Sequence, residues 1–339
     1  MTSQLRTYQS PTRRVLLLGA TGTIGRATAR TLATRGHDVV CLVRQSSEVD
    51  TDEAMRKLQA ELGGADVRLG EAADPNSLLS AGLRGESFDA IVSCLASRTG
   101  APMDAWAIDY QAHADALTIA KDARVSQFIL LSAICVQKPR LEFQRAKLAF
   151  ESLLIESGLT YSIVRPTAYF KSLSGQIDRL RQGKAFLLFG NGKLTSCKPI
   201  SDNDLAAFLA DCLSRPDRHN KILPVGGPGE AITPREQGEL LFDLLGIPAQ
   251  FRSIPIGVVR AVTSGMSGLA AILPSLAEKA EFARTAHYYA TESMLVWDPV
   301  SGAYSDSATP SYGTDTLRAH YQRVIASRAS VSLRDHALF

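Results

Sequence analysis

The most constraining feature of the sequence is a glycine turn close to its start, where Gly19, Gly22 and Gly25 are spaced as G-x-x-G-x-x-G. The turn directly follows the apolar run 15–19 and opens a helical pattern over 22–35. In a strand–turn–helix of this kind, the first glycine allows the sharp bend, the second lets the backbone approach a pyrophosphate, and the third lets the helix pack against the strand. The helix N-terminus offers N–H groups and a positive dipole end to the phosphates. We therefore expect a dinucleotide to contact Gly19, Thr21, Gly22, Thr23, Ile24 and Gly25.

Short apolar runs alternate with helical patterns through the first half of the chain. After the run at 15–19 they lie at 39–43, 65–69, 88–95, 128–132 and 161–164. Continuous apolar strands that alternate with helices are typical of a parallel sheet covered on both faces. Because the crossovers between such strands are right-handed, the pattern predicts an α/β fold with a doubly wound parallel sheet of the Rossmann type.

The pattern changes after Pro166. The segments 185–189 and 194–200 flank a Gly-Asn-Gly turn, which predicts two strands joined by that turn. A capping box at 233–236, with Pro at the first helical position, predicts a helix that ends at Leu245. The expected organisation is an NAD(P)-binding domain over 13–166, a smaller substrate lobe over 167–325 with some segments that return to the first domain, and flexible tails at 1–12 and 326–339.

Composition and charge exclude several classes of protein. The 339 residues are 45 % apolar and 21 % charged, with a formal net charge of +3. This balance is typical of a folded globular chain and gives no electrostatic reason to expect nucleic acid as a partner. The 5 cysteines are scattered, and the 6 histidines form no pair at helical ligand spacing. No disulfide framework, metal site or iron–sulfur cluster is therefore expected.

The sequence also bears on location. The N-terminal residues contain no apolar segment typical of a secretory signal, and they are few for an organelle transit peptide, so a bacterial cytoplasmic protein is the simplest interpretation. The longest uncharged run, 261–277, is interrupted by Ser, Gly and Pro and is too short and polar to span a bilayer. It is expected to form either a surface helix pair or lid, or a patch that touches a membrane peripherally.

The end of the second strand indicates which dinucleotide binds. An acid there would accept a hydrogen bond from the ribose of NAD, but the sequence has Arg44 and no acid over 43–46. Because Arg44 can pair with a 2′-phosphate, we expect NADPH as the cofactor. Asp74 and Ser93 follow the third and fourth strands, whose carboxyl ends meet at the ligand-binding edge of the sheet. Asp74 is therefore expected near the adenine and Ser93 near the ribose.

Phe143 and Lys147 lie four residues apart, and therefore on one face of the helix predicted over 141–157. With Ser132 at the end of the fifth strand, this pattern resembles the short-chain dehydrogenase/reductase superfamily, in which a Tyr-x-x-x-Lys helix lies beside the nicotinamide. The resemblance implies that Lys147 binds the nicotinamide ribose and that Ser132 and Lys147 are catalytic. Phe143 stands where that family has its acidic Tyr, and a phenyl ring has no proton to give. Reduction of a conjugated C=C bond suits such a site, because the substrate's own π-system delocalises the developing charge.

Longer stretches resemble one family of reductases more specifically. They are the segments 132–139, 141–147, 161–173, 197–201, 288–295 and 309–313. These segments are similar to the divinyl chlorophyllide a 8-vinyl reductases, and the similarity covers nearly all of 14–324. It implies NADPH-dependent reduction of the C8 vinyl group of divinyl chlorophyllide or protochlorophyllide to ethyl, in the biosynthesis of chlorophyll or bacteriochlorophyll, without flavin or iron–sulfur cluster. Ser132, Lys147 or bound water would supply the proton.

The implied substrate is a flat macrocycle with a central Mg and a propionate. Its pocket should therefore be broad and apolar, with a few polar or cationic anchors. The expected substrate contacts are Phe143, Tyr161, Tyr169 and Phe170. Lys171 and Arg165 are candidates for the propionate, but solvated surface positions are the favoured interpretation for both side chains. Two other interpretations stay open: a different NADPH-dependent C=C or C=O reductase, and a non-catalytic NADP-sensing protein.

Overall fold

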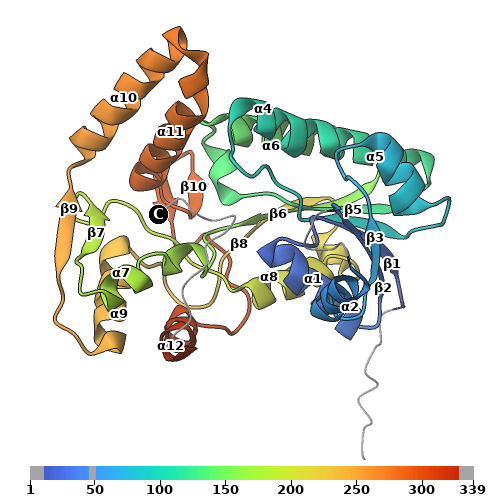
Figure 1. Ribbon diagram of the computed structural model, residues 1–339, viewed down its shortest axis with the longest axis horizontal. Helices are drawn as coiled ribbons and strands as arrows, with labels where there is room; N and C mark the ends of the chain where they lie inside the picture. Colours follow the sequence, from blue (N-terminus) through green and yellow to red (C-terminus); the bar gives the residue numbers. More distant parts are fainter. Residues whose placement is uncertain (1–10, 46–50, 328–339) are drawn as a thin grey trace, which may run out of the picture.

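The computed structural model describes residues 11–45 and 51–327, and its centre is a seven-stranded parallel sheet (Figure 1). The strands lie in the order β3-β2-β1-β4-β5-β6-β8. They are β1 (Arg14–Leu18), β2 (Asp38–Val43), β3 (Asp66–Leu69), β4 (Ala90–Ser93), β5 (Gln127–Leu131), β6 (Thr160–Pro166) and β8 (Lys221–Val225). All neighbouring pairs in this sheet run parallel. The strand order reverses between β1 and β4, as in a Rossmann sheet, which confirms the predicted fold class.

Helices cover both faces of this sheet because successive side chains of each strand point to opposite faces. In β1, Val15 and Leu17 pack toward one layer of helices, and Leu16 and Leu18 pack toward the other. The first layer consists of α1 (Thr23–Thr34), α2 (Asp52–Glu61) and α8 (Asp202–Asp211). The second layer consists of α3 (Pro75–Ser77), α4 (Pro102–Ala105), α5 (His113–Asp122) and α6 (Glu142–Ile155), with π-helical turns at Leu78–Leu83 and Trp106–Ala112.

A smaller lobe lies beside the sheet, and the chain enters it after the carboxyl end of β6 (Figure 1). Its core contains the buried aromatic rings of Phe170, Phe186, Phe242 and Tyr321. The lobe consists of α7 (Ile177–Arg181), β7 (Phe186–Phe189), α9 (Pro234–Leu245), β9 (Phe251–Ile254), α10 (Ile256–Ile272), α11 (Ala277–Thr291), β10 (Val296–Asp298), β11 (Ala303–Ser305) and α12 (Leu317–Ser327). Between these elements the chain returns to the sheet, because α8 packs on α1 and β8 pairs with β6. The division into domains at 166 stays a prediction.

The hairpin predicted over 185–200 is wrong. β7 forms, but its partner is β9, to which it runs parallel. The segment after the turn makes only isolated bridges, from Cys197 to Ile232 and Met294 and from Ile200 to Tyr169. The predicted turn itself is present, since Gly190 and Gly192 both have positive φ. Contacts with segments distant in the sequence, however, determine where the chain goes after the turn.

Two other predicted segments have clear outcomes. The helix at 233–245 is confirmed: Thr233 and Glu236 form the capping box, and Gly246 ends α9 with a φ of 67°. Residues 261–277 fall in α10 and at the start of α11, which form the helix pair named as one of the two alternatives. Among residues 11–45 and 51–327, no helix is long and apolar enough to cross a bilayer. The flexible tails predicted at 1–12 and 326–339 lie largely outside the described residues.

Candidate active site

The glycine turn has the geometry that a dinucleotide site requires. Gly19 has a φ of +75°, and a β-carbon there would lie 2.6 Å from the carbonyl of Cys94. A β-carbon at Gly25 would overlap the carbonyl oxygen of Gly19, so the turn and α1 pack together only with glycine at both positions. At Gly22 a β-carbon would meet only the Gly19 oxygen, at 3.5 Å, and no side chain caps the N-terminus of α1. The outer face of the turn is therefore open to a phosphate.

Lys171 adds a positive charge to this turn. Its Nζ donates a hydrogen bond of 2.9 Å to Oγ1 of Thr23, the first residue of α1. The ammonium therefore lies at the helix end where phosphates bind, in the place that suits the cofactor rather than a propionate. The two residues are 148 positions apart, so their contact leaves no local pattern in the sequence.

Arg44 follows β2 at the edge of the sheet, as predicted, but it already has an anionic partner. Its Nε lies 2.5 Å from Oε2 of Glu71, and its side chain is 55 % exposed. Arg26 is similarly paired with Glu61 and also donates to the carbonyl oxygen of Thr21. A 2′-phosphate at this edge would share Arg44 with Glu71. In that position Glu71 would compete with the phosphate for the Arg44 guanidinium.

Asp74 and Ser93 lie where the strands end, but both side chains have partners within the chain. Asp74 caps α3 by accepting a hydrogen bond from the N–H of Asn76. Ser93 is buried, and its Oγ lies 2.8 Å from Nε2 of His113. Since Nδ1 of the same ring lies 2.8 Å from the carbonyl oxygen of Ile108, the neutral ring donates from Nδ1 and accepts from Ser93. Both predicted side chains therefore already take part in contacts within the chain.

Lys147 lies on α6 in a buried ion pair and is only 8 % exposed. Its Nζ lies 2.8 Å from Oδ1 of Asp109, whose carboxylate also accepts a hydrogen bond of 2.5 Å from the Ser97 hydroxyl. Asp109 comes from the π-helical turn before α5, and such turns are frequent at functional sites. An ammonium has three N–H donors and this ion pair uses one. The arrangement positions Lys147 firmly and is consistent with a role in binding a ribose.

Ser132 belongs to a different buried network of hydrogen bonds and ion pairs. Its Oγ donates to Glu151, which lies one helical turn beyond Lys147 on α6. Arg165 of β6 pairs with the same carboxylate. Ser132 and Glu151 are 3 % and 2 % exposed, so this network fixes α6 against the sheet. The same contacts make Arg165 part of the interior and not a surface cation.

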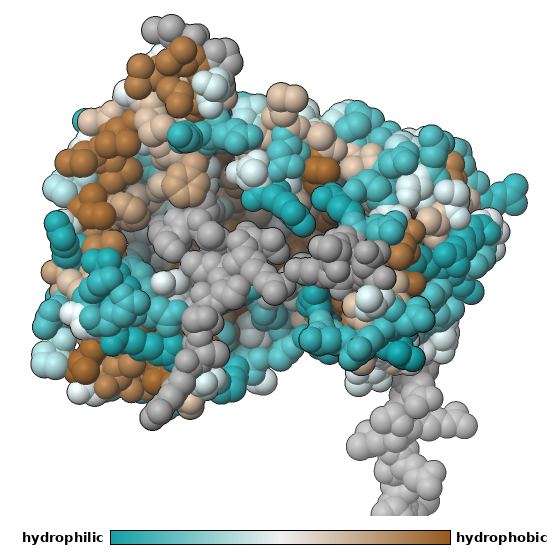
Figure 2. Space-filling model, in the orientation of Figure 1, coloured by the Kyte–Doolittle hydropathy of each residue, from teal (hydrophilic) through white to brown (hydrophobic). Residues whose placement is uncertain are grey.

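An apolar cavity of about 260 Å³ lies between the ends of β5 and β6 and the smaller lobe. Its wall includes Ala133, Ile134, Cys135, Pro166, Ala168, Tyr169, Leu173, Phe186, Phe189, Leu194, Ile232, Tyr289, Glu292 and Met294. In Figure 2 the molecule is hollowed between the sheet domain and the lobe, and hydrophobic side chains gather on the lobe side. The carboxyl ends of the strands meet here, which is where ligands bind in folds of this class.

Of the four predicted substrate contacts, the structure brings Tyr169 to the wall of this cavity. Phe143 packs beside it, against the cluster that contains Cys135 and Tyr288. Phe170 is buried in the core of the lobe instead, because the chain turns inward after Tyr169. Tyr161 lies near the amino end of β6 and packs on the core of the second helix layer, so it is at the opposite edge of the sheet.

Sequence reasoning missed a second phenol in the wall, that of Tyr289 on α11. Burial raises the pKa of Tyr289 well above its ordinary value, with a further contribution from Cys135, and burial also raises the pKa of Tyr169. Both phenols therefore keep their protons at neutral pH. Asp109, the partner of Lys147, was missed as well, because nothing in the local sequence relates it to a residue 38 positions away.

Comparison with known proteins now identifies the family. Residues 19–216 match the model of a family described as NAD(P)H-binding. The chain is 49 % identical over 316 residues to the divinyl chlorophyllide a 8-vinyl-reductase of Zea mays. This alignment covers 92 % of this chain and 79 % of that protein. It is 47 % identical over 322 residues to the protein of the same name from Arabidopsis thaliana, over 92 % of this chain and 76 % of that protein.

A solved structure shows the same fold at much lower identity. An NADPH-dependent quinone oxidoreductase from Escherichia coli, complexed with NADPH, aligns with a TM-score of 0.64 and 17 % identity, over 92 % of this chain and 99 % of that chain. That likeness concerns the fold alone. The identity to the plant proteins is far higher and extends over most of both chains, and the glycine turn and the cavity are both in place. The chain belongs to the divinyl chlorophyllide a 8-vinyl-reductase family.

Proposed function

We propose that this chain reduces the C8 vinyl group of a divinyl chlorophyllide or protochlorophyllide to ethyl, with NADPH as the electron donor. The observation that supports this most directly is the place of the apolar cavity, which lies beside the carboxyl edge of the sheet that also holds the glycine turn. Family membership supplies the substrate class, and the open outer face of Gly22 suits a dinucleotide. Arg44 favours the phosphorylated form of that dinucleotide.

The absence of an acidic side chain at Phe143 agrees with this reaction. When bound, the reduced nicotinamide supplies a hydride, and the alkene also needs one proton. Hydride addition at the outer carbon of the vinyl group leaves negative charge on the inner carbon, from which it spreads into the macrocycle. The protein therefore does not need to protonate a carbonyl oxygen. Its task is to hold the flat substrate in an apolar wall beside the cofactor.

The proton must then reach the inner carbon. Ser132 donates to Glu151, so the proposal does not depend on its hydroxyl. Lys147 is held by Asp109 and is assigned to the ribose of the cofactor. Tyr169 and Tyr289 are hydroxyl groups within the wall itself, and both are protonated at neutral pH. The cavity wall thus offers two hydroxyl groups as proton donors, in addition to the candidates outside the wall, Ser132, Lys147 and bound water.

The test is an assay with purified protein, NADPH and divinyl chlorophyllide, followed through the absorption spectrum of the pigment. We expect a blue shift of the Soret band as the vinyl group loses its conjugation with the macrocycle. Unchanged pigment, with NADPH demonstrably bound, would favour the NADP-sensing alternative. Turnover of a quinone but not of the pigment would favour a different reductase.

The proposal includes peripheral contact with a membrane surface, through the pair of helices α10 and α11. Exposed apolar side chains line one face of α10, at Val258, Val262 and Leu269, and the exposed Leu273 directly follows the helix. Steps of 4 and 7 residues keep the three helical positions on one side of α10. Figure 2 shows hydrophobic side chains gathered over this pair of helices. An apolar pigment that partitions into lipid would be encountered at such a surface.

A further inference from the structure

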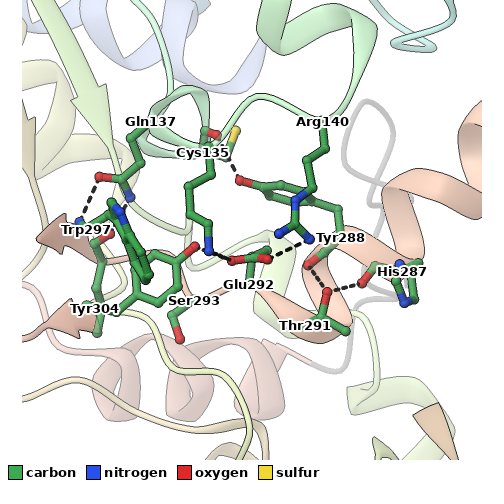
Figure 3. Close-up of polar contacts among 12 residues, drawn as sticks. Cys135, Gln137, Arg140, His287, Tyr288, Thr291, Glu292, Ser293, Trp297 and Tyr304 are labelled. Carbon is green, nitrogen blue, oxygen red and sulfur yellow. Dashed lines mark hydrogen bonds and ion pairs between the residues drawn. The ribbon is translucent and has the colours of Figure 1, made fainter. Parts of the chain in front are cut away.

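A cluster of charged and aromatic side chains adjoins the cavity where α11 ends (Figure 3). At its centre is Glu292, which is part of the cavity wall and has a side chain only 7 % exposed. Its Oε2 lies 2.7 Å from Nζ of Lys138 and accepts a hydrogen bond of 2.5 Å from the Tyr304 hydroxyl. Its Oε1 lies 2.8 Å from Nη1 of Arg140. Both oxygens of the buried carboxylate are therefore in use within the cluster.

Lys138 is held on several sides by this cluster. Besides its ion pair with Glu292, its Nζ lies 4.0 Å from the ring centroid of Trp297 and 5.2 Å from that of Tyr304. The position of Trp297 is itself fixed, because the Gln137 side chain accepts a hydrogen bond of 2.8 Å from the backbone N–H of Trp297. The side chain of Lys138 is 23 % exposed, so little of it faces an incoming ligand.

Arg140 differs from Lys138 in its exposure, since its side chain is 56 % exposed. A guanidinium has five N–H donors in a planar fork, and the contact with Glu292 involves one nitrogen.

The charge of the cluster is also unbalanced. Burial alone would raise the pKa of Glu292, but the hydrogen bonds from Lys138 and Tyr304 and the charge of Arg140 outweigh it, and its pKa is lowered. One carboxylate thus faces two cations, which leaves a net positive charge at the edge of an otherwise apolar cavity.

The size of the cavity leaves part of a large substrate outside it. Pockets that enclose a drug-sized ligand measure roughly 300–1,000 Å³, and the cavity here is about 260 Å³. A tetrapyrrole is larger than most such ligands, so some of the macrocycle must remain outside the enclosed space. The C8 vinyl group and the propionate are on rings at opposite sides of the macrocycle. If the vinyl end faces the cofactor, the propionate end projects away from it, toward the rim.

We propose that Arg140 binds the free propionate carboxylate of the pigment, with Glu292 and Lys138 as the residues that position its guanidinium. This inference rests on the proposed function and adds the anchor that selects a pigment with a free acid over its ester. A bidentate pair between guanidinium and carboxylate fits a planar, exposed fork at the rim of an apolar pocket. Because both oxygens of Glu292 already have partners, the structure assigns it to holding Arg140 and not to ligating the pigment's Mg.

The experiment compares divinyl chlorophyllide with its propionate methyl ester, in wild type, Arg140→Gln and a matched control, Arg145→Gln. Arg145 is a similarly exposed arginine nearby on α6 that pairs with Glu142. Wild type should favour the free acid by about 10- to 100-fold in Kd and in kcat/KM, as expected for a charge-assisted pair. Arg140→Gln should remove most of that preference, and Arg145→Gln should keep it. The Kd for NADPH should be unchanged in both variants.

Equilibrium binding of each pigment, measured by absorption without NADPH, separates this inference from the proposed function. If wild type binds the acid more tightly than the ester but reduces neither, the proposed reaction fails and the carboxylate subsite stands. Equal binding of acid and ester by wild type, or a preference that survives in Arg140→Gln, would overturn the subsite. Should Arg140→Gln fail to fold, wild type still decides the matter. Its affinity for the acid should fall with added salt, and its affinity for the ester should not.

Discussion

At the scale of single residues, Arg44 is the side chain on which the choice between NADPH and NADH depends. Replacing it by Glu should raise the KM for NADPH by about 10- to 100-fold, because a charge-assisted contact with the 2′-phosphate is lost and a repulsion replaces it. The KM for NADH should change little. Glu71→Gln should act in the opposite direction, since it frees Arg44 from its present partner.

The control for this prediction is Arg56→Glu, which makes the same charge change at an exposed position of α2. Steady-state kinetics with both cofactors would check it. An unchanged KM for NADPH in Arg44→Glu would contradict the assignment of Arg44 and leave the cofactor preference to other residues.

Lys147 combines a functional and a structural role, which a pair of variants can separate. Lys147→Met leaves the buried carboxylate of Asp109 without its cation and should cost about 3–5 kcal/mol of stability as well as most of the activity. Adding Asp109→Leu removes the unpaired charge, so the double variant should regain much of that stability. Denaturant unfolding and turnover, measured on the same samples, would check both effects. Full turnover in either variant would remove Lys147 from the mechanism.

The residues also show how far sequence reasoning reaches. The glycine turn, Arg44 and Lys147 lie at the strand ends and on the helix that the sequence predicts, because each belongs to a short local motif. The partners that define their chemistry were not predictable. Asp109 and Lys147 are joined only by the fold, as are Lys171 and Thr23, and such contacts leave no local pattern. Local sequence can also suggest a contact that the fold does not make. Tyr161 and Phe170 were expected to contact the substrate, but both pack in other parts of the molecule and not in the cavity wall.

At the scale of elements, α10 presents an apolar face that the rest of the described chain leaves exposed. Val262→Glu introduces a charge on that face. Burial of the wild-type valine side chain in lipid would contribute roughly 1.5–3 kcal/mol to membrane binding, and the variant loses this contribution. We expect the protein to co-sediment with vesicles that contain phosphatidylglycerol, and we expect this variant to lower the binding by tenfold or more.

Ser264→Glu provides the matched control, because it adds the same charge to an exposed position on the opposite side of α10. It should leave vesicle binding almost unchanged. Two results would contradict the contact: wild type that stays in the supernatant at every lipid concentration, or equal effects of the two substitutions.

The elements themselves were predicted unevenly, for a physical reason. The inner strands β1, β2, β4 and β5 are buried on both faces, so each contains a continuous apolar run that stands out from the helices around it. The edge strands β3 and β8 are more polar or more exposed and give a weaker signal. The lobe lacks this regularity. β7 and β9 are short, and their pairing brings together segments that α9 separates, so a nearby turn was a misleading guide to the partner of β7.

At the scale of the whole molecule, His113 should make stability depend on pH. Burial, with a smaller effect of Lys147, lowers its pKa from 6.5 to about 4. The unfolded chain therefore takes up a proton between pH 6.5 and 4 that the folded chain refuses, and stability falls as the pH falls through this window. The loss should be about 3 kcal/mol by pH 4.

Urea unfolding at several pH values, on wild type and His113→Gln, would check this expectation. The variant should be less stable at pH 7 because the contacts with Ser93 and Ile108 are altered, but its stability should decline less toward acid pH. Identical slopes for the two proteins between pH 6.5 and 4 would show that other groups account for the acid sensitivity.

The proposed function of the whole molecule depends on one transfer of hydride, from the reduced nicotinamide to the vinyl group of the pigment. A decisive experiment uses NADPH with deuterium at both C4 positions and analyses the recovered pigment by mass spectrometry and NMR. We expect one deuterium per molecule of product, located in the new ethyl group at C8. Pigment that is unchanged, or ethyl product without deuterium from this cofactor, would contradict the proposed function.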